Sequence, residues 1–180
     1  ERSLQIAYRD LSLALECPEH GLMTGYPVPP GAFEDRSLEE VTTVMFRRAI
    51  GEIESGVAGV CQRCWGTVET EWPTDAPEWK SASEDLTWVE IACDRCWLTY
   101  KVPCRTVMAA SPAVRGFYTE NGYDQIAALV GPVSTSSETV CSITVHDDRR
   151  VTTTIELEDT LSITFDEEFD VVDQTRSSSE

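Results

Sequence analysis

Two Cys-x-x-Cys pairs constrain the fold of this chain more than any other feature of its sequence. Cys61 and Cys64 form the first pair, and Cys93 and Cys96 form the second. Four thiolates in two short loops suit the tetrahedral sulphur coordination of zinc, in which Zn–S bonds are near ~2.3 Å. Each pair also reads Cys-x-Arg-Cys-Trp, so the two loops repeat one another. The sequence therefore predicts one structural Zn²⁺ held by these four cysteines in a zinc ribbon.

Two other interpretations of the cysteine pairs need different surroundings. Two disulfides would require an oxidising compartment, and a redox dithiol of the thioredoxin type would occur once, in a βαβ unit. The segment between the pairs, residues 65–92, is longer than the ~15–20 residues of compact zinc sites. A β hairpin inserted between the two loops accounts for that length, and the matched pair favours the metal.

The charge of the chain indicates the solvent in which it works. The formal net charge is −18, from 32 Asp and Glu against 14 Lys and Arg, and the acidic residues are spread from end to end. Such an excess repels itself in dilute buffer, but ~1 M salt shortens the screening length to about 3 Å. We therefore expect the cytoplasm of a salt-accumulating halophile, the alternative being an acidic surface that binds a protein partner. The same charge disfavours direct binding of DNA or of an anionic membrane.

Length and termini bound the organisation of the chain. Its 180 residues allow one or two small domains, and no apolar run is long enough to span a bilayer. The first residues, Glu1 to Leu4, include no start Met and do not resemble a signal peptide. We therefore expect a cytoplasmic fragment of a longer protein.

Local signals predict an α+β fold: a zinc ribbon with a capped amphipathic helix and a small antiparallel C-terminal sheet. Ser37 and Glu40 form a capping box, and Gly56 and Gly59 are expected to end the helix that it opens. Its expected apolar stripe is Leu38, Val41, Met45, Ala49 and Ile53. A second helix is expected to start at Ser111-Pro112 and to stop near Asn121-Gly122. Strands are expected over 3–9, 11–16, 66–72, 86–92, 97–102, 139–146, 151–156, 160–165 and 169–172, with an extended Pro-rich path over 26–31 where three prolines oppose a helix.

These elements divide the chain into five segments. They are a half zinc-ribbon-like hairpin with the Pro-rich segment (1–30), the amphipathic helix (31–58), the zinc ribbon (59–104), a short helix with antiparallel strands (105–174), and a flexible tail (175–180). Cys17 and His20, at the end of the first hairpin, are spaced as half of a further metal site.

In this order the elements resemble the C-terminal region of haloarchaeal transcriptional regulators of the winged-helix, ArsR-like type. The resemblance covers nearly all 180 residues and rests on several motifs followed by a strand-rich end: Cys17–His20, Tyr26–Gly31, Arg36–Ser37, Gly59–Cys64, Cys93–Cys96 and Pro112–Asp124. It implies a DNA-binding winged helix outside this chain. It also implies that Cys17 and His20 are the second half of another ribbon whose first half lies before Glu1, which would leave a second, incomplete metal site. Cys104 or Cys141 are alternative ligands for that site.

The remaining candidate residues point away from catalysis. The sequence has only two histidines and no nucleophile elbow, phosphate-binding loop or Ser/His/Asp arrangement, so we expect no enzyme. Trp65 and Trp97 stand where ribbons usually have Gly, and we expect them to pack over the ribbon. Cys104 and Cys141 are expected to be small buried hydrophobic residues.

Two functions follow. The first is an accessory domain, for dimerisation or signal sensing, of a homodimeric transcriptional regulator that meets DNA only through its absent N-terminal domain, with an unspecified small-molecule effector. The alternative is a zinc-ribbon module that binds a protein partner and has no sensing role.

Overall fold

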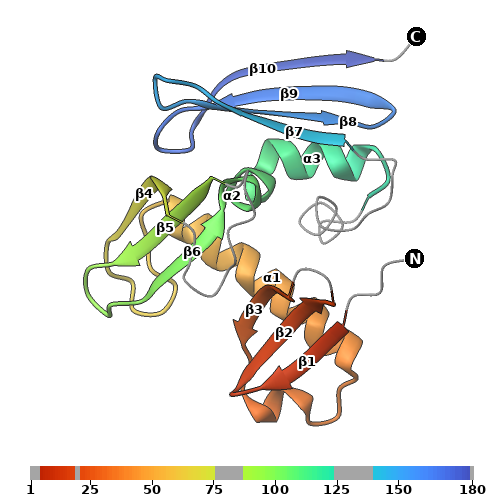
Figure 1. The fold of residues 1–180 in the computed structure, drawn as a ribbon, viewed down its shortest axis with the longest axis vertical. Coiled ribbons are helices and arrows are strands. Elements are labelled where there is room, and N and C mark those ends of the chain that lie inside the picture. The colour runs from red at the N-terminus through yellow and green to blue at the C-terminus, as the bar shows by residue number, and fades with distance from the viewer. Residues whose placement is uncertain (1–4, 19–20, 76–86, 124–139, 179–180) are drawn as a thin grey trace. The chain divides into compact units, whose positions relative to one another are not determined.

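The computed structural model describes residues 5–18, 21–75, 87–123 and 140–178 (Figure 1). The described residues form two compact units, divided within helix α1 (Leu38–Val57) between Gly51 and Glu52. Three small antiparallel sheets and three α-helices make up the described part of the chain, so the predicted α+β class is confirmed. Within the described residues, every helix is too short or too polar to cross a bilayer.

The first unit is a three-stranded sheet with the first part of α1. Its strands are β1 (Gln5–Arg9), β2 (Ser12–Cys17) and β3 (Gly21–Pro27), in the order β1-β2-β3. Leu13, Val28, Val41 and Met45 form its core. Strand β3 overlaps the predicted extended path (26–31) only at Tyr26 and Pro27, and its first five residues were not predicted as a strand.

The Pro-rich segment contains a short helix that the sequence interpretation opposed. A 3-10 helix, η1, spans Pro30–Phe33. Pro30 lies at its first position, where the missing N–H would have had no intrahelical partner in any case, so proline starts this helix rather than preventing it.

Helix α1 begins at the predicted capping box. The Oγ of Ser37 accepts from the N–H of Glu40 at 3.2 Å, and the N–H of Ser37 donates to Glu40 Oε2 at 2.7 Å. The Ser37 backbone N–H, and then its hydroxyl, lower the pKa of the Glu40 carboxyl by stabilising its charged form. The capping box is therefore confirmed.

Helix α1 ends at Val57 in a Schellman motif that includes both predicted glycines, Gly56 and Gly59. The N–H of Val60 donates to Ser55 O at 2.8 Å, and the N–H of Gly59 donates to Gly56 O at 2.9 Å. Gly59 has φ +77°, a left-handed conformation that glycine adopts without steric cost. Along the predicted stripe Val41, Met45 and Ile53 are buried, whereas Leu38 is exposed.

The second unit contains the cysteine pairs. Strands β4 (Val68–Thr74), β5 (Trp88–Cys93) and β6 (Thr99–Pro103) form an antiparallel sheet in the order β4-β5-β6. Helices α2 (Cys104–Ala110) and α3 (Pro112–Glu120) follow. The predicted hairpin between the pairs is thus present as β4 and β5, although most of the loop that joins them lies outside the described residues. Helix α3 matches the predicted helix, and α2 was not predicted.

A four-stranded antiparallel sheet completes the second unit. Its strands β7 (Val140–Val145), β8 (Val151–Glu156), β9 (Asp159–Phe165) and β10 (Val171–Ser178) lie in the order β10-β9-β8-β7. Alternate residues of β8 and β9 point into the core, as expected for strands with one buried face. The most deeply buried of them are Val151, Ile155, Leu161, Ile163 and Phe165.

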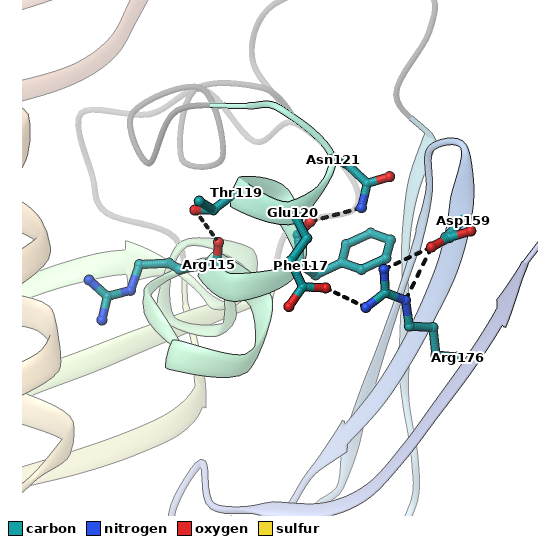
Figure 2. Close-up of polar contacts among 7 residues, drawn as sticks. All are labelled: Arg115, Phe117, Thr119, Glu120, Asn121, Asp159 and Arg176. Atoms are coloured by element: carbon teal, nitrogen blue, oxygen red, sulfur yellow. Dashed lines mark hydrogen bonds and ion pairs between the residues drawn. The ribbon is translucent and has the colours of Figure 1, made fainter.

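Most of the predicted flexible tail (175–180) is ordered, because strand β10 continues through Ser178, paired with β9. Figure 2 shows Arg176 reaching from β10 to Asp159, whose Oδ2 accepts from Nη2 at 2.7 Å, and to Glu120 on α3. The guanidinium also lies 5.2 Å from the centre of the Phe117 ring. Arg176 therefore joins the last strand to its neighbour and to α3.

Candidate metal centre

The two Cys-x-x-Cys loops, here called the knuckles, both adjoin the β4–β6 sheet, here called the ribbon sheet. The first (Cys61–Gly66) connects the end of α1 to β4, and the second (Cys93–Leu98) connects β5 to β6. The same hydrogen bond closes both: the N–H of Cys61 donates to Gly66 O at 3.0 Å, and the N–H of Cys93 donates to Leu98 O at 2.9 Å. The repeated sequence thus produces a repeated local structure.

The four cysteine sulphurs form one cluster. Cys61 Sγ lies 3.7 Å from Cys96 Sγ, Cys64 Sγ lies 3.5 Å from Cys93 Sγ, and all four lie within 4.8 Å of one another. A tetrahedron with Zn–S bonds of ~2.3 Å has sulphurs about 3.8 Å apart. Each of these cysteines is free, and their separations exceed the ~2.05 Å of a disulfide. The cluster is therefore a candidate metal site compatible with zinc.

The surroundings of two of these thiols shift their pKa values in opposite directions, that of Cys93 downwards and that of Cys64 upwards. The backbone N–H groups of Cys96 and Arg95 point to the Cys93 sulphur and outweigh its burial, which lowers the pKa of Cys93 to about 7. The N–H of Gly66 acts in the same direction on Cys64. There, burial and the neighbouring sulphurs prevail and raise the pKa of Cys64 to about 12. A divalent cation would replace the remaining protons and remove the repulsion between thiolates.

Close packing joins the two knuckles. A Cβ on Gly66 would stand 2.7 Å from Arg95 Cβ and 3.2 Å from Cys64 Sγ, so only glycine fits there without displacement. Arg95 Nη1 also donates to Cys64 O at 3.4 Å. The stem of Arg95 therefore lies against the first knuckle beside the cluster.

The last turn of α1 packs on the ribbon next to Cys61. A Cβ on Gly56 would stand 2.8 Å from Ile91 Cγ2 and 3.0 Å from the Tyr100 hydroxyl oxygen. That hydroxyl donates to Glu52 O at 3.0 Å, and Arg115 of α3 forms an ion pair with Glu54. The helix end, the ribbon and α3 are thus fixed to one another within the second unit.

Trp65 and Trp97 differ from the sequence prediction. Their side chains are 84% and 86% exposed, so the prediction that they pack over the ribbon is wrong. Both have left-handed backbones, with φ +60° and +57°. For a residue with a side chain this conformation costs roughly 1–2 kcal/mol. The knuckles keep the turn that ribbons usually make with Gly, and the left-handed turn carries each indole into solvent.

Arg63 and Arg95 lie inside the knuckles and are exposed. Neither guanidinium forms an ion pair with a described residue. Their positive charges lie beside a cluster that would carry a formal −2 charge as a zinc tetrathiolate.

The other predicted ligands do not join this cluster. Cys17 is the last residue of β2. Its side chain and all of His20 lie outside the described residues, so the second metal site stays a prediction. Cys104 is buried in α2, as predicted, and burial raises its pKa to about 12. Cys141 is half-buried on β7, with its Sγ 3.5 Å from Thr153 Oγ1. In the described part of the chain, the four knuckle cysteines are the one group with metal-ligand spacing.

A protein-family model described as a domain of unknown function (DUF7351) matches residues 1–171. No curated protein and no solved structure matches the chain. The matched range includes both knuckles, helix α1 and the first three strands of the C-terminal sheet.

Proposed function

The chain belongs to the DUF7351 family, and we propose that it is a zinc-binding accessory domain of a transcriptional regulator. In this proposal one Zn²⁺ is structural, and the domain serves dimerisation or signal sensing. A winged helix outside residues 1–180 contacts DNA, and the protein works in the cytoplasm of a halophilic archaeon.

The cluster of four free sulphurs is the observation that carries the proposal. Four protein thiolates fill a tetrahedral site and leave no position for a substrate or an activated water. The ion then stabilises the ribbon and takes no part in a reaction. Because the ligands come from both knuckles, the ion joins the end of α1 to the β5–β6 hairpin.

The regulatory part of the proposal is supported by the resemblance to winged-helix regulators and by helix α1. This helix of 20 residues belongs to both compact units, and its last turn is held by Tyr100 and Arg115. These contacts join α1 to the β4–β6 sheet and to α3 within the second unit, so a change at the cysteine cluster can reach the helix. The net charge of −18 leaves DNA binding to another part of the protein.

The metal is tested by native mass spectrometry of the reduced protein in high salt. We expect one zinc per chain, and its loss in the Cys61→Ser and Cys93→Ser variants. A chain that folds without metal would refute the zinc assignment. Two ions per chain would show that Cys17 and His20 recruit further ligands.

The regulatory role is tested on the full-length protein. We expect its affinity for operator DNA to change when zinc is removed, when mild oxidant attacks the cysteines or when an effector binds. If a version lacking residues 1–180 bound DNA identically under all these conditions, the regulatory role would fail.

The exposed tryptophans favour a second candidate, an interaction module without a sensing role. A domain of this kind would bind its partner equally well in all effector and redox states, and it would leave DNA affinity unchanged. The same DNA-binding titration therefore separates the two candidates.

A further inference from the structure

We propose that the two knuckle tips form one docking surface for an acidic, partly apolar segment of another protein. This surface, called the knuckle surface, consists of Arg63, Trp65, Arg95 and Trp97. The inference rests on the metal-binding part of the proposed function, because the ion holds the two tips together. It names the partner chemistry that the accessory domain recognises.

The tryptophans are the first evidence. Indoles that are 84% and 86% exposed contribute little to packing within this chain. Both also keep a backbone conformation that glycine would adopt without strain. The fold thus gains nothing evident from Trp at either position, and strain of this kind is often retained at functional sites. Trp is also among the residues most enriched where binding energy concentrates in protein interfaces.

The two tips are parts of one surface. Trp65 and Trp97 each directly follow a cysteine whose sulphur belongs to the same cluster, with all four sulphurs within 4.8 Å. Arg95, from the second knuckle, lies against Gly66 and donates to Cys64 O, on either side of Trp65. A single partner segment can therefore contact both indoles.

The charge of the knuckle surface contrasts with the chain around it. Half of the described Arg and Lys residues form ion pairs with described residues, namely Arg9, Lys101, Arg115, Arg149, Arg150 and Arg176. Arg63 and Arg95 form none with a described residue, although the net charge is −18 and carboxylates are abundant. Two exposed guanidinium groups beside two indoles suit carboxylates flanked by apolar side chains, because a guanidinium can bind a carboxylate through two parallel hydrogen bonds.

A peptide fits this surface better than a nucleic acid does. Single-stranded nucleic acids also stack on aromatic side chains, but they need a positively charged groove that follows the backbone. Here the cations are two, Asp94 stands beside Arg95, and a polyanion would approach a strongly acidic chain. A short segment with a few carboxylates meets only the local positive charge.

The test uses the zinc-loaded chain and a panel of labelled, short Glu-rich peptides, each with one Leu and one Phe at varied positions. Binding is measured by fluorescence anisotropy over a range of salt concentrations. The comparison probes are the same peptides with Gln in place of Glu, and a thymidine oligonucleotide of similar length. We expect at least one acidic peptide to bind, and to bind more weakly as salt rises.

The decisive variant is Trp65→Gly/Trp97→Gly. It should retain zinc and show a higher thermal midpoint, because strain is relieved, while affinity for the peptide falls by about tenfold or more. Leu11→Gly is the matched control, since Leu11 is also exposed and has φ +58° but lies far along the chain from the knuckles. It should leave peptide affinity unchanged.

Arg63→Gln/Arg95→Gln should weaken binding several-fold and reduce its salt dependence.

Several results would overturn the proposal: no acidic peptide binds, the Gln peptides bind equally well, the oligonucleotide binds more tightly, or the glycine variant binds like the parent. Zinc content is measured on every sample. If the glycine variant kept its full zinc content and bound the peptide like the parent, the docking proposal would be refuted and the metal proposal would not. A parent chain without zinc defeats the metal-binding function on which the surface rests.

Discussion

The ribbon sheet (β4–β6) and the C-terminal sheet (β7–β10) are both antiparallel, but different interactions hold them. The C-terminal sheet has a continuous buried face to which β8 and β9 contribute every second residue. In the ribbon sheet, buried apolar residues such as Trp72, Trp88 and Val89 lie within β4 and β5, and the tips of the adjoining knuckles are polar or exposed. At that end the buried groups include Cys61 and Cys93, and we expect a bound ion to take the place of an apolar core.

This difference implies that the two sheets respond to different perturbations. Apolar burial contributes roughly 25 cal/mol per Å² wherever packing is intact, without any ligand. A metal site contributes its binding free energy only while its ligands are deprotonated and the ion is present. The predictions below test this division, from the largest expected effect to the smallest.

The largest effect is expected from Cys61→Ser. Losing one of four ligands should lower zinc affinity by orders of magnitude and destabilise the ribbon by several kcal/mol, because structural zinc contributes ~10–16 kcal/mol in small zinc domains. Hydrogen exchange should quicken in β4–β6 and remain slow in β8 and β9. Cys141→Ser, a free cysteine outside the cluster, is the control and should keep one zinc. Equal loss of protection in both sheets would contradict the division.

The converse change is Ile163→Ala in the C-terminal sheet. Ile163 is fully buried, and its truncation leaves a cavity, so we expect a loss of about 3 kcal/mol in the free energy of unfolding. Denaturant titration measures the loss, and zinc stoichiometry should not change. Thr175→Ala, on the exposed strand β10, should alter stability by less than ~0.5 kcal/mol. Zinc loss in the Ile163 variant would show that the two sheets depend on one another.

Gly66→Ala tests the contact between the knuckles. The new methyl group would stand 2.7 Å from Arg95 Cβ, so the knuckles must separate, and we expect a cost of about 2 kcal/mol together with weaker zinc binding. A chelator competition measures the affinity. Gly116→Ala is the matched control, because a Cβ at Gly116 of α3 meets no heavy atom within 4 Å. That variant should be as stable as the parent or up to ~1 kcal/mol more stable.

Acid should weaken zinc binding without weakening the C-terminal core. Zinc competes with protons, and the Cys64 thiol, with a pKa of about 12, carries a proton at neutral pH that zinc must displace. Affinity should therefore fall at least tenfold for each unit that the pH is lowered. Below pH 7 the fall should steepen, because the Cys93 thiol, with a pKa of about 7, also becomes protonated. Affinity independent of pH between 6 and 8 would contradict this ligand set.

The features predicted from sequence depend on residues close together in the chain. The capping box at Ser37, the left-handed glycine at Gly59 and the Ser-Pro start of α3 are each specified within a few residues. The four-sulphur cluster could be predicted from the sequence for a related reason. Each knuckle is a local structure, and the repeat shows that the two belong together.

The features that were missed depend on contacts between distant residues. Beyond Val172, where the predicted strand ended, β10 is polar and exposed, and it is held by pairing with β9 and by Arg176, which binds Asp159 and Glu120. Helix α2 starts directly after β6, where no separate capping signal marks it. Trp65 is a large apolar residue of a type that is usually buried. Only the structure shows that its side chain faces solvent, on a left-handed backbone.

The placement of the indoles gives the molecule an optical consequence. Trp72 and Trp88 are almost fully buried, whereas Trp65 and Trp97 flank the sulphur cluster in solvent. A neutral quencher such as acrylamide should therefore reach the exposed pair first, and their emission should lie at longer wavelength than that of the buried pair. The intrinsic fluorescence of the chain thus contains a signal from Trp65 and Trp97. We expect this signal to change when a metal binds the cysteine cluster, without an added label.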